Sequence, residues 1–272
     1  MRNAQSGITW LQLWSLLLII VFLVPLFYVF NTSLKSDTDF LKSSVSLASS
    51  LRWQNYAEAW KQASFDSYVF NSLFYLIVIV GLSLLMALFL AFPIARKSTA
   101  FSGLIYTAFL AGMFLPNGII PLFQMLLSLD LYNSRTGYIL TLVNGGGVTL
   151  FFFVSYIKGI PKDFDEAAAI DGCGYFRYMF LIMTPLMKPA LSSMAILAAI
   201  NVWNEVIHAI VFLSSDRLYP VTRGLFVFKG QYSVSWPLLS AALVMVAAPL
   251  LILYLFLQRF VIDGVVAGGV KA

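Results

Sequence analysis

Four polar residues interrupt an apolar segment near residue 205, and they are the residues of this sequence best suited to bind a solute or to transfer a proton. Their spacings of three and four place them on one face of a helix. They are Asn201, Asn204, Glu205 and His208. Amide, carboxylate and imidazole groups can hydrogen-bond the hydroxyl groups of a polar solute, and a carboxylate in an apolar segment is costly unless it faces water or a partner. Two readings stay open for Glu205: it lines a solute path, or it holds helices together through His208 or a basic residue of a partner. The structural reading is favoured for His208.

Catalytic and metal chemistry have few candidates here. Cys173 is the single cysteine and His208 the single histidine, so an internal disulfide and a structural zinc site are both excluded. Glu205 and His208 are the one pair suited to acid and base work, which is too little to predict an enzyme. We predict no catalytic residue and no metal site.

A second group of residues with a defined pattern lies in the charged segment 158–188. Asp163, followed three residues later by Glu166, has the spacing of a capping box, alanines follow, and Gly172 is suited to end a helix. The sequence predicts a short surface helix whose small Ala167 and Ala168 allow a partner protein to approach closely. An ordinary capped loop helix is the equally weighted alternative.

The composition of the chain indicates what kind of elements position these residues. The chain has 272 residues, of which 60% are hydrophobic and 11% charged, and its mean hydropathy is +0.87. A soluble domain carries about a quarter charged residues, so most of this chain is solvated by lipid. The net charge of +5 comes from scattered basic residues without a stripe, which argues against nucleic acid.

Six apolar segments are long enough to cross a bilayer as helices, which takes roughly 20 residues each. We therefore predict an all-α polytopic membrane protein with a single transmembrane domain over 1–272. A cleaved signal peptide is the less favoured alternative for the first segment, because its apolar run is long and no small-residue cleavage site follows. Residues 35–66 and 214–236 are polar loops, the first with short surface helices. The predicted spans are 11–30, 67–95, 101–127, 136–157, 189–213 and 237–258.

Prolines and glycines stand in the middle of the third and fourth of these spans. Pro116 and Pro121 predict a kinked third helix that faces the bundle, because lipid cannot satisfy the carbonyl groups that proline frees. Asn117 and Gln124 beside them either satisfy that backbone or line a path. In the fourth span, Asn144 precedes three glycines, which predicts close helix packing.

The segment 158–188 resembles the EAA loop of ATP-binding-cassette (ABC) importer permeases. That pattern is E-A-A, three residues, G, nine residues and I-x-L-P, and it is matched here by Glu166, Ala167, Ala168, Gly172, Ile182 and Pro185. Thr184 stands where the family has leucine. In the family this short coupling helix docks on the ATPase subunit. The resemblance implies such a docking role for Asp163, Asp165, Glu166, Ala167, Ala168, Asp171 and Gly172.

Other positions resemble the carbohydrate-uptake branch of this family, specifically the shorter, maltose-type permease partner. They are Trp203–Glu205, Pro220, Gly224–Leu225, Trp236, Pro249 and the ending 268–272. The resemblance implies a sugar or oligosaccharide importer of a bacterial inner membrane, with both termini and the coupling loop in the cytoplasm. It also implies a heterodimer with a second permease, two ATP-binding subunits that hold ATP and Mg, and an extracellular or periplasmic sugar-binding protein.

Polar residues within the spans, a clue independent of the resemblance, and basic residues in one loop are candidates for contact with the solute and with the binding protein. We expect Asn117, Gln124, Asn144, Asn201, Asn204 and Glu205 as candidates for the translocation path. Arg217, Arg223 and Lys229 in the loop 214–236 are candidates for contact with the binding protein. The sequence has no phosphate-binding loop, because Gly145–Gly147 lack a following Lys-Ser or Lys-Thr. A permease for another solute, or less favourably a stand-alone secondary transporter or membrane enzyme, is the alternative.

Overall fold

The regular structure of this protein is helical. The computed structural model describes residues 2–98, 100–116, 118–228 and 234–269, and in these ranges it contains helices and no strand. The all-α prediction is thereby confirmed. The chain divides into two compact units, one made of residues 1–66 and 223–249 and the other of 67–222 and 250–272.

The first unit begins with a long apolar helix, α1 (Arg2–Ser33), which contains the predicted span 11–30. Its most apolar 18-residue window has no buried residue, so α1 needs lipid or another chain around it. The polar segment that follows folds into the short helices α2 (Asp37–Lys42) and α3 (Gln54–Gln62), as the sequence predicted. Lys35 is fully buried between them, and its amine donates to the carbonyls of Ser43 and Ser44 at 2.9 and 3.0 Å.

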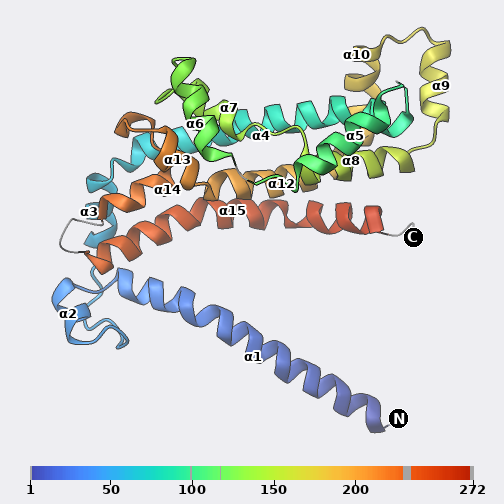
Figure 1. The fold of residues 1–272 in the computed structure, drawn as a ribbon. Helices are drawn as coiled ribbons and strands as arrows, with labels where there is room; N and C mark the ends of the chain where they lie inside the picture. The colour runs from blue at the N-terminus through green and yellow to red at the C-terminus, as the bar shows by residue number, and fades with distance from the viewer. Residues whose placement is uncertain (1, 99, 117, 229–233, 270–272) are drawn as a thin grey trace. The chain divides into compact units, whose positions relative to one another are not determined.

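The second unit is organised along α4 (Phe65–Arg96), which continues through Pro93 without a break. Alanines and aliphatic residues on one face of α4 pack against α8 (Gly147–Gly159) and α12 (Lys188–Asn204). Methionines from the segment before α12 complete this core. In Figure 1 the short helices α9 and α10 lie at one end of α4, while α6 and α13 lie at the other.

The third and fourth predicted spans are not single helices. Residues 101–127 form α5 (Ser102–Gly112) and α6 (Ile119–Ser128), and Pro116 lies in the gap between them. Residues 136–157 form α7 (Arg135–Leu142) and α8, which meet at 54° across the break at 143–146. The third span was predicted as one kinked helix and the fourth as one helix, and both are instead interrupted. Pro116 cannot extend α5, and Gly147 at φ +63° leaves helical geometry.

The fifth predicted span is also interrupted. α12 ends at Asn204, Glu205 has an extended backbone, and α13 (Ile207–Phe212) follows. Before α12, residues 175–186 form α10 (Tyr175–Tyr178), the π-helix η1 (Met179–Met183) and α11 (Thr184–Leu186). This segment meets α12 at 82°, so the two cannot both run along the membrane normal.

The remaining elements are the 3₁₀ turn η2 (Asp216–Leu218), α14 (Val221–Gly224), the 3₁₀ turn η3 (Leu225–Phe228) and α15 (Trp236–Gly269). Among the described residues, two helices are long and apolar enough to cross a bilayer, or up to four if each bent pair counts as one span. α15 contains the predicted span 237–258.

Candidate functional site

The predicted surface helix of the loop 158–188 is present as α9 (Asp163–Ile170). Its N-cap is Lys162, and no side chain caps the first turn, so the predicted capping box of Asp163 and Glu166 was wrong. Both carboxylates lie instead in the first helical turn, together with Asp165. Negative charge at that end is favoured because the helix dipole presents positive partial charge there.

The end of α9 is a Schellman turn built on Gly172. The Gly172 N–H donates to the Ala169 carbonyl at 3.1 Å, and the Cys173 N–H reaches back to the Ala168 carbonyl at 2.9 Å. Gly172 has φ +66°, which agrees with the prediction that it stops the helix. This conformation suits glycine because it lacks a Cβ.

Asp165 fastens α9 to the end of α4. Its carboxylate forms an ion pair with Arg96, whose Nε lies 2.6 Å from Asp165 Oδ2, and Arg96 also donates to the Ile160 carbonyl at 3.1 Å. The Tyr178 hydroxyl donates to the same carboxylate. Burial and then the neighbouring carboxylate raise the pKa of the Tyr178 phenol, so the phenol remains a donor. The role of Asp165 toward another subunit stays a prediction, but its carboxylate already has two partners in this chain.

The two faces of α9 differ in what they contact. Ala168 is 5% exposed and packs in the core of the second unit. Phe164, Ala167 and Ile170, spaced by three, are exposed, and Ile170, which lies opposite Ala168 on the helix, retains 87% of its surface. An isoleucine exposed to this degree on a short helix offers apolar area to a partner. Phe164 and Ile170 were not predicted as contact residues, although their spacing from Ala167 would have revealed them.

The segment after α9 contains Thr184, which stands where the family pattern has leucine. The π-helix Met179–Met183 widens the turn, and the Thr184 hydroxyl donates to the Met179 carbonyl at 2.7 Å. A leucine could not make this bond. The same segment is held to α4 by aromatic contacts, including Phe92 with Tyr178 at 5.4 Å and Phe89 with Phe180 at 5.6 Å between ring centroids.

The polar residues near 205 do not form one helical stripe. Asn201 and Asn204 lie on α12 with exposed side chains, whereas Glu205 lies past its end. Glu205 Oε1 accepts the His208 N–H at 2.9 Å and lies 3.1 Å from His208 Nδ1. Glu205 therefore caps the first turn of α13, and the contact between Glu205 and His208 foreseen in the structural reading is present.

The other candidate path residues are dispersed. Gln124 is exposed on α6, and Asn117 lies outside the described residues. Asn144 is at the break between α7 and α8, where its N–H donates to Ser83 Oγ at 3.0 Å and its Oδ1 accepts the Gly146 N–H at 2.8 Å. A cavity of about 380 Å³ opens beside it, lined also by Phe109 and Gly147.

The glycines at this break allow the close packing that was predicted. A Cβ on Gly145 would lie 2.6 Å from the Cβ of Met86 on α4, and one on Gly146 would lie 2.5 Å from the Phe109 ring. Both distances are far below van der Waals contact, so α4 and α5 approach the backbone here because no side chain intervenes.

The loop before α14 is tied to the start of α4. Asn71 donates through Nδ2 to the carbonyls of Arg217 and Tyr219, at 2.8 and 3.1 Å. The Tyr75 hydroxyl donates to the Leu218 carbonyl at 2.9 Å. These bonds leave the Arg217 side chain exposed, as a docking role requires.

The residues that order this loop were not predicted from the sequence. Arg135 donates to Asn71 Oδ1 at 3.0 Å, and Asn133 Oδ1 accepts the N–H groups of Ser214 and Ser215 at 2.9 Å each. Of the other candidate binding-protein contacts, Arg223 has its guanidinium 5.4 Å from the Phe226 ring. Lys229 lies outside the described residues.

These contacts place α9 and the loop 214–222 at opposite ends of α4. Asn71 binds the loop, and Arg96 binds α9. Twenty-five positions separate Asn71 from Arg96, which corresponds to about 38 Å of helix. This exceeds the hydrocarbon thickness of about 30 Å, so a membrane crossed by α4 has the two groups on opposite sides.

Comparison with known proteins shows a family model and several relatives that this chain matches. Residues 79–266 match the family described as binding-protein-dependent transport system inner membrane component. The chain is 33% identical over 272 residues to the diacetylchitobiose uptake system permease protein NgcG of Streptomyces coelicolor, covering 98% of this chain and 89% of the relative. It is also 33% identical over 253 residues to the arabinooligosaccharides transport system permease protein AraQ of Halalkalibacterium halodurans, covering 91% and 90%.

A solved structure has the same fold. The chain superimposes with a TM-score of 0.80 on a bacterial ABC transporter involved in the import of the acidic polysaccharide alginate, at 23% identity, covering 90% of this chain and 94% of that one. The matched residues 79–266 include α9, the break at Asn144 and the ends of α12 and α13. The chain belongs to the family of binding-protein-dependent transport system inner membrane components, the membrane-embedded permeases of ABC importers.

Proposed function

We propose that this chain is a permease subunit of an ABC importer for a sugar or oligosaccharide. The observation that carries the proposal is full-length similarity to relatives named for diacetylchitobiose and arabinooligosaccharide transport. A third relative, the melibiose/raffinose/stachyose import permease protein MelC of Bacillus subtilis, is 28% identical over 258 residues. The chain would build the translocation path as a heterodimer with a second permease in the bacterial inner membrane.

In this proposal, six segments cross the membrane, some of them as broken helices, and both termini are cytoplasmic. α9 is the coupling helix, and its exposed face of Phe164, Ala167 and Ile170 docks on one of two ATP-binding subunits. The attachment of α9 to α4 through Arg96 supports this role, because a docking helix must transmit force to a membrane helix. ATP and Mg would be bound by those partner subunits.

A soluble sugar-binding protein would deliver solute at the other end of α4. The exposed Arg217 and the loop that carries it support this assignment, because Asn71 and Tyr75 hold the loop backbone in one position. Solute would then pass the exposed amides Gln124, Asn144, Asn201 and Asn204, whose hydrogen-bonding capacity suits sugar hydroxyl groups.

The function is tested by purifying the tagged chain from its native membrane in mild detergent. A second permease and an ATPase should co-purify, and the ATPase rate in proteoliposomes should rise with the binding protein and a short oligosaccharide. A chain that purifies alone and transports without ATP contradicts the proposal. Stimulation by amino acids and by none of a panel of oligosaccharides would retain the ABC permease and reject sugar as its solute.

Docking on α9 is tested by two variants. Ala167→Trp adds bulk to the exposed face, and Ile170→Asp puts a charge where apolar contact is expected. Ile170→Asp should lower ATPase retention about tenfold or more, because burying one large aliphatic side chain contributes roughly 1.5–3 kcal/mol. Ala167→Trp should lower it because the indole ring prevents close approach of the partner. Ala57→Trp, at an exposed alanine of the short helix α3, is the matched control and should retain the ATPase fully. Equal retention in all three variants contradicts docking at this face.

A further inference from the structure

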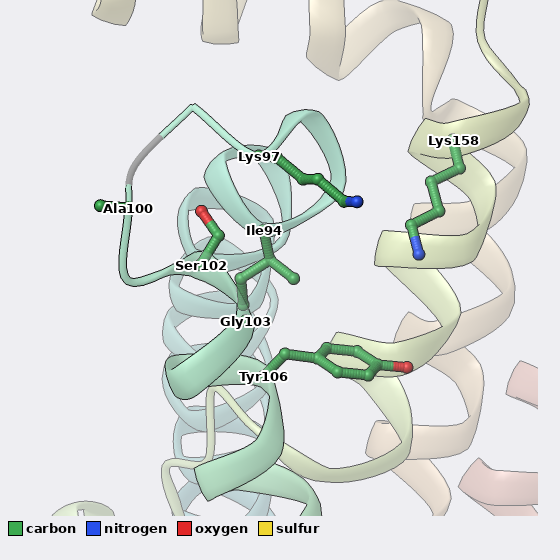
Figure 2. Close-up of a pocket in the computed structure, with 7 residues that line it drawn as sticks. All are labelled: Ile94, Lys97, Ala100, Ser102, Gly103, Tyr106 and Lys158. Carbon is green, nitrogen blue, oxygen red and sulfur yellow. The ribbon is translucent and has the colours of Figure 1, made fainter.

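A basic pocket lies where α4 ends, α5 begins and α8 ends. It has a volume of about 330 Å³, and Lys97, Lys158, Ser102 and Tyr106 are among its lining residues. Figure 2 shows the two lysines extending from opposite walls toward the space between them, with the Tyr106 ring below. All of these residues belong to the second unit.

The backbone sets the direction in which each lysine side chain leaves its helix. Lys97 directly follows the last residue of α4 and has φ +51°, so the chain turns there and the side chain leaves the helix axis. Lys158 lies in the last turn of α8, with Nζ 5.9 Å from the Tyr106 ring centroid. This distance is within the range of a cation–π contact and orients the side chain over the pocket.

Among the side chains that the structure describes, no carboxylate neutralises the two positive charges. Within the described part of the structure, neither lysine lies within ion-pair distance of a carboxylate, and the nearby Asp165 is held by Arg96. Two ammonium groups that converge on one space repel each other, and an anion between them removes that repulsion. The pocket therefore has the charge of an anion site.

The surface beside the pocket is apolar. Phe101 is 66% exposed and Leu104 is 68% exposed, and both neighbour the pocket residues Ser102 and Gly103 in sequence. Paired cations beside exposed aromatic and aliphatic side chains match the boundary between headgroups and acyl chains. A soluble anion would make no use of this apolar surface.

We propose that this pocket binds the phosphate of an anionic phospholipid, with Lys97 and Lys158 on the headgroup and the acyl chains along Phe101 and Leu104. This inference is independent of the solute transported. It places the pocket at the same end of α4 as Arg96 and α9, so a bound lipid would lie beside the segment that we propose as the ATPase docking site.

The test is native mass spectrometry of the complex purified through this chain, after titration with dioleoyl phosphatidylglycerol or dioleoyl phosphatidylcholine. Phosphatidylglycerol should bind in preference to phosphatidylcholine. Each lysine near an anionic lipid surface adds a similar amount of binding free energy. Lys97→Gln or Lys158→Gln should therefore weaken phosphatidylglycerol binding about fivefold, and the double variant about thirtyfold. Lys188→Gln removes the charge of an exposed lysine outside the pocket and should leave binding unchanged.

Three outcomes would overturn the proposal. Equal retention of phosphatidylglycerol by the double variant removes the site. Displacement of bound phosphatidylglycerol by millimolar inorganic phosphate assigns the pocket to a soluble anion. Loss of a partner subunit from the double variant, without a change in lipid retention by the remaining chains, assigns the lysines to a protein interface. Leu104→Ala separates the lipid from other anions further, because it should weaken phosphatidylglycerol binding without affecting charge.

Discussion

Gly172 is the residue on whose backbone conformation the end of α9 depends. Gly172 and Gly174 both have open space where a Cβ would be, but only Gly172 has a positive φ. Gly172→Ala should therefore lower stability by about 1 kcal/mol, since an L-residue is strained in the left-handed region. Gly174→Ala, at φ −66°, should be neutral. Thermal unfolding of both variants in detergent measures the difference, and equal melting temperatures would contradict the strain at Gly172.

Glu205 is expected to respond differently to two substitutions. Glu205→Gln keeps an oxygen that accepts the His208 N–H, so the free energy of unfolding should fall by about 1 kcal/mol or less. Glu205→Leu leaves that N–H without its acceptor and should cost roughly 1–3 kcal/mol. Complex yield and thermal stability measure both. Reduced uptake by Glu205→Gln at normal stability would identify a path role, and full uptake and yield of Glu205→Leu would reject both readings.

The sequence predicted the conformation of single residues where it depends on neighbouring positions. It did not predict the orientations and contacts that depend on the fold. The left-handed conformation of Gly172 follows from glycine at the end of a short helix, and it was foreseen. The inward orientation of Ala168 depends on the core of α4, α8 and α12. The ion pair of Asp165 with Arg96 joins residues 69 positions apart, which no local pattern predicts.

At the scale of elements, the link between α4 and α9 is the contact most open to measurement. The Arg96 side chain is 8% exposed and that of Asp165 is 24% exposed. Removing one member of a fully buried pair costs about 3–5 kcal/mol, and partial exposure lowers this. We expect Asp165→Asn and Arg96→Gln each to cost roughly 1–3 kcal/mol, and Tyr178→Phe about 1 kcal/mol for its lost hydrogen bond.

A double-mutant cycle isolates this contact. The combined Asp165→Asn and Arg96→Gln variant should be less destabilised than the sum of the single variants, by roughly 0.5–3 kcal/mol. Arg52→Gln with Glu58→Gln is the matched control, because this ion pair at 3.2 Å is about 40% exposed on both sides and should show coupling below about 1 kcal/mol. Additive effects at Arg96 and Asp165 would contradict an anchoring role for the pair.

Hydropathy located the apolar segments but not their breaks. A run of apolar residues reports that a segment is buried in lipid or protein, and it does not report whether its hydrogen bonds are continuous. The break at 143–146 depends on Ser83 and Asn144, which bind freed backbone groups. The end of α12 depends on Glu205 and on the Thr222 hydroxyl, which lies 3.4 Å from the Glu205 carbonyl. These compensating hydrogen bonds come from residues that are distant in the sequence. The sequence therefore predicted a kink at Pro116 but not a complete break of the helix.

At the scale of the whole molecule, the position of α9 and of the loop 214–222 at opposite ends of α4 predicts a labelling pattern. In a Cys173→Ser background, Asp216→Cys should react with a membrane-impermeant maleimide in intact spheroplasts. Glu166→Cys should react only in inverted vesicles. Both native side chains are exposed within this chain, so membranes stripped of the ATPase and the binding protein leave both positions open to the reagent. Labelling of both from the same side would show that α4 does not cross the membrane, and the reverse pattern would invert the proposed orientation.

The family and the helical class could be derived from sequence because both depend on composition and on one spaced motif. The membrane orientation could not be derived from charge alone, since basic residues lie at both ends: Arg96 and Lys158 at one, Arg135 and Arg217 at the other. The length of α4 places these two groups of basic residues at opposite ends of the helix.

The continuity of α4 has a thermodynamic consequence for how the two sides of the membrane communicate. One rigid element, α4, joins a hydrogen-bonded loop to an ion-paired helix. A ligand that changes the conformation at one end of α4 therefore changes the conformational equilibrium at the other end. Reciprocity then applies: if a soluble protein at the loop changes the affinity of α9 for an ATPase, the ATPase must change the affinity of that protein by the same factor, typically about 5–150-fold. Cutting the Arg96 link should reduce both factors together, even though neither ligand contacts Arg96.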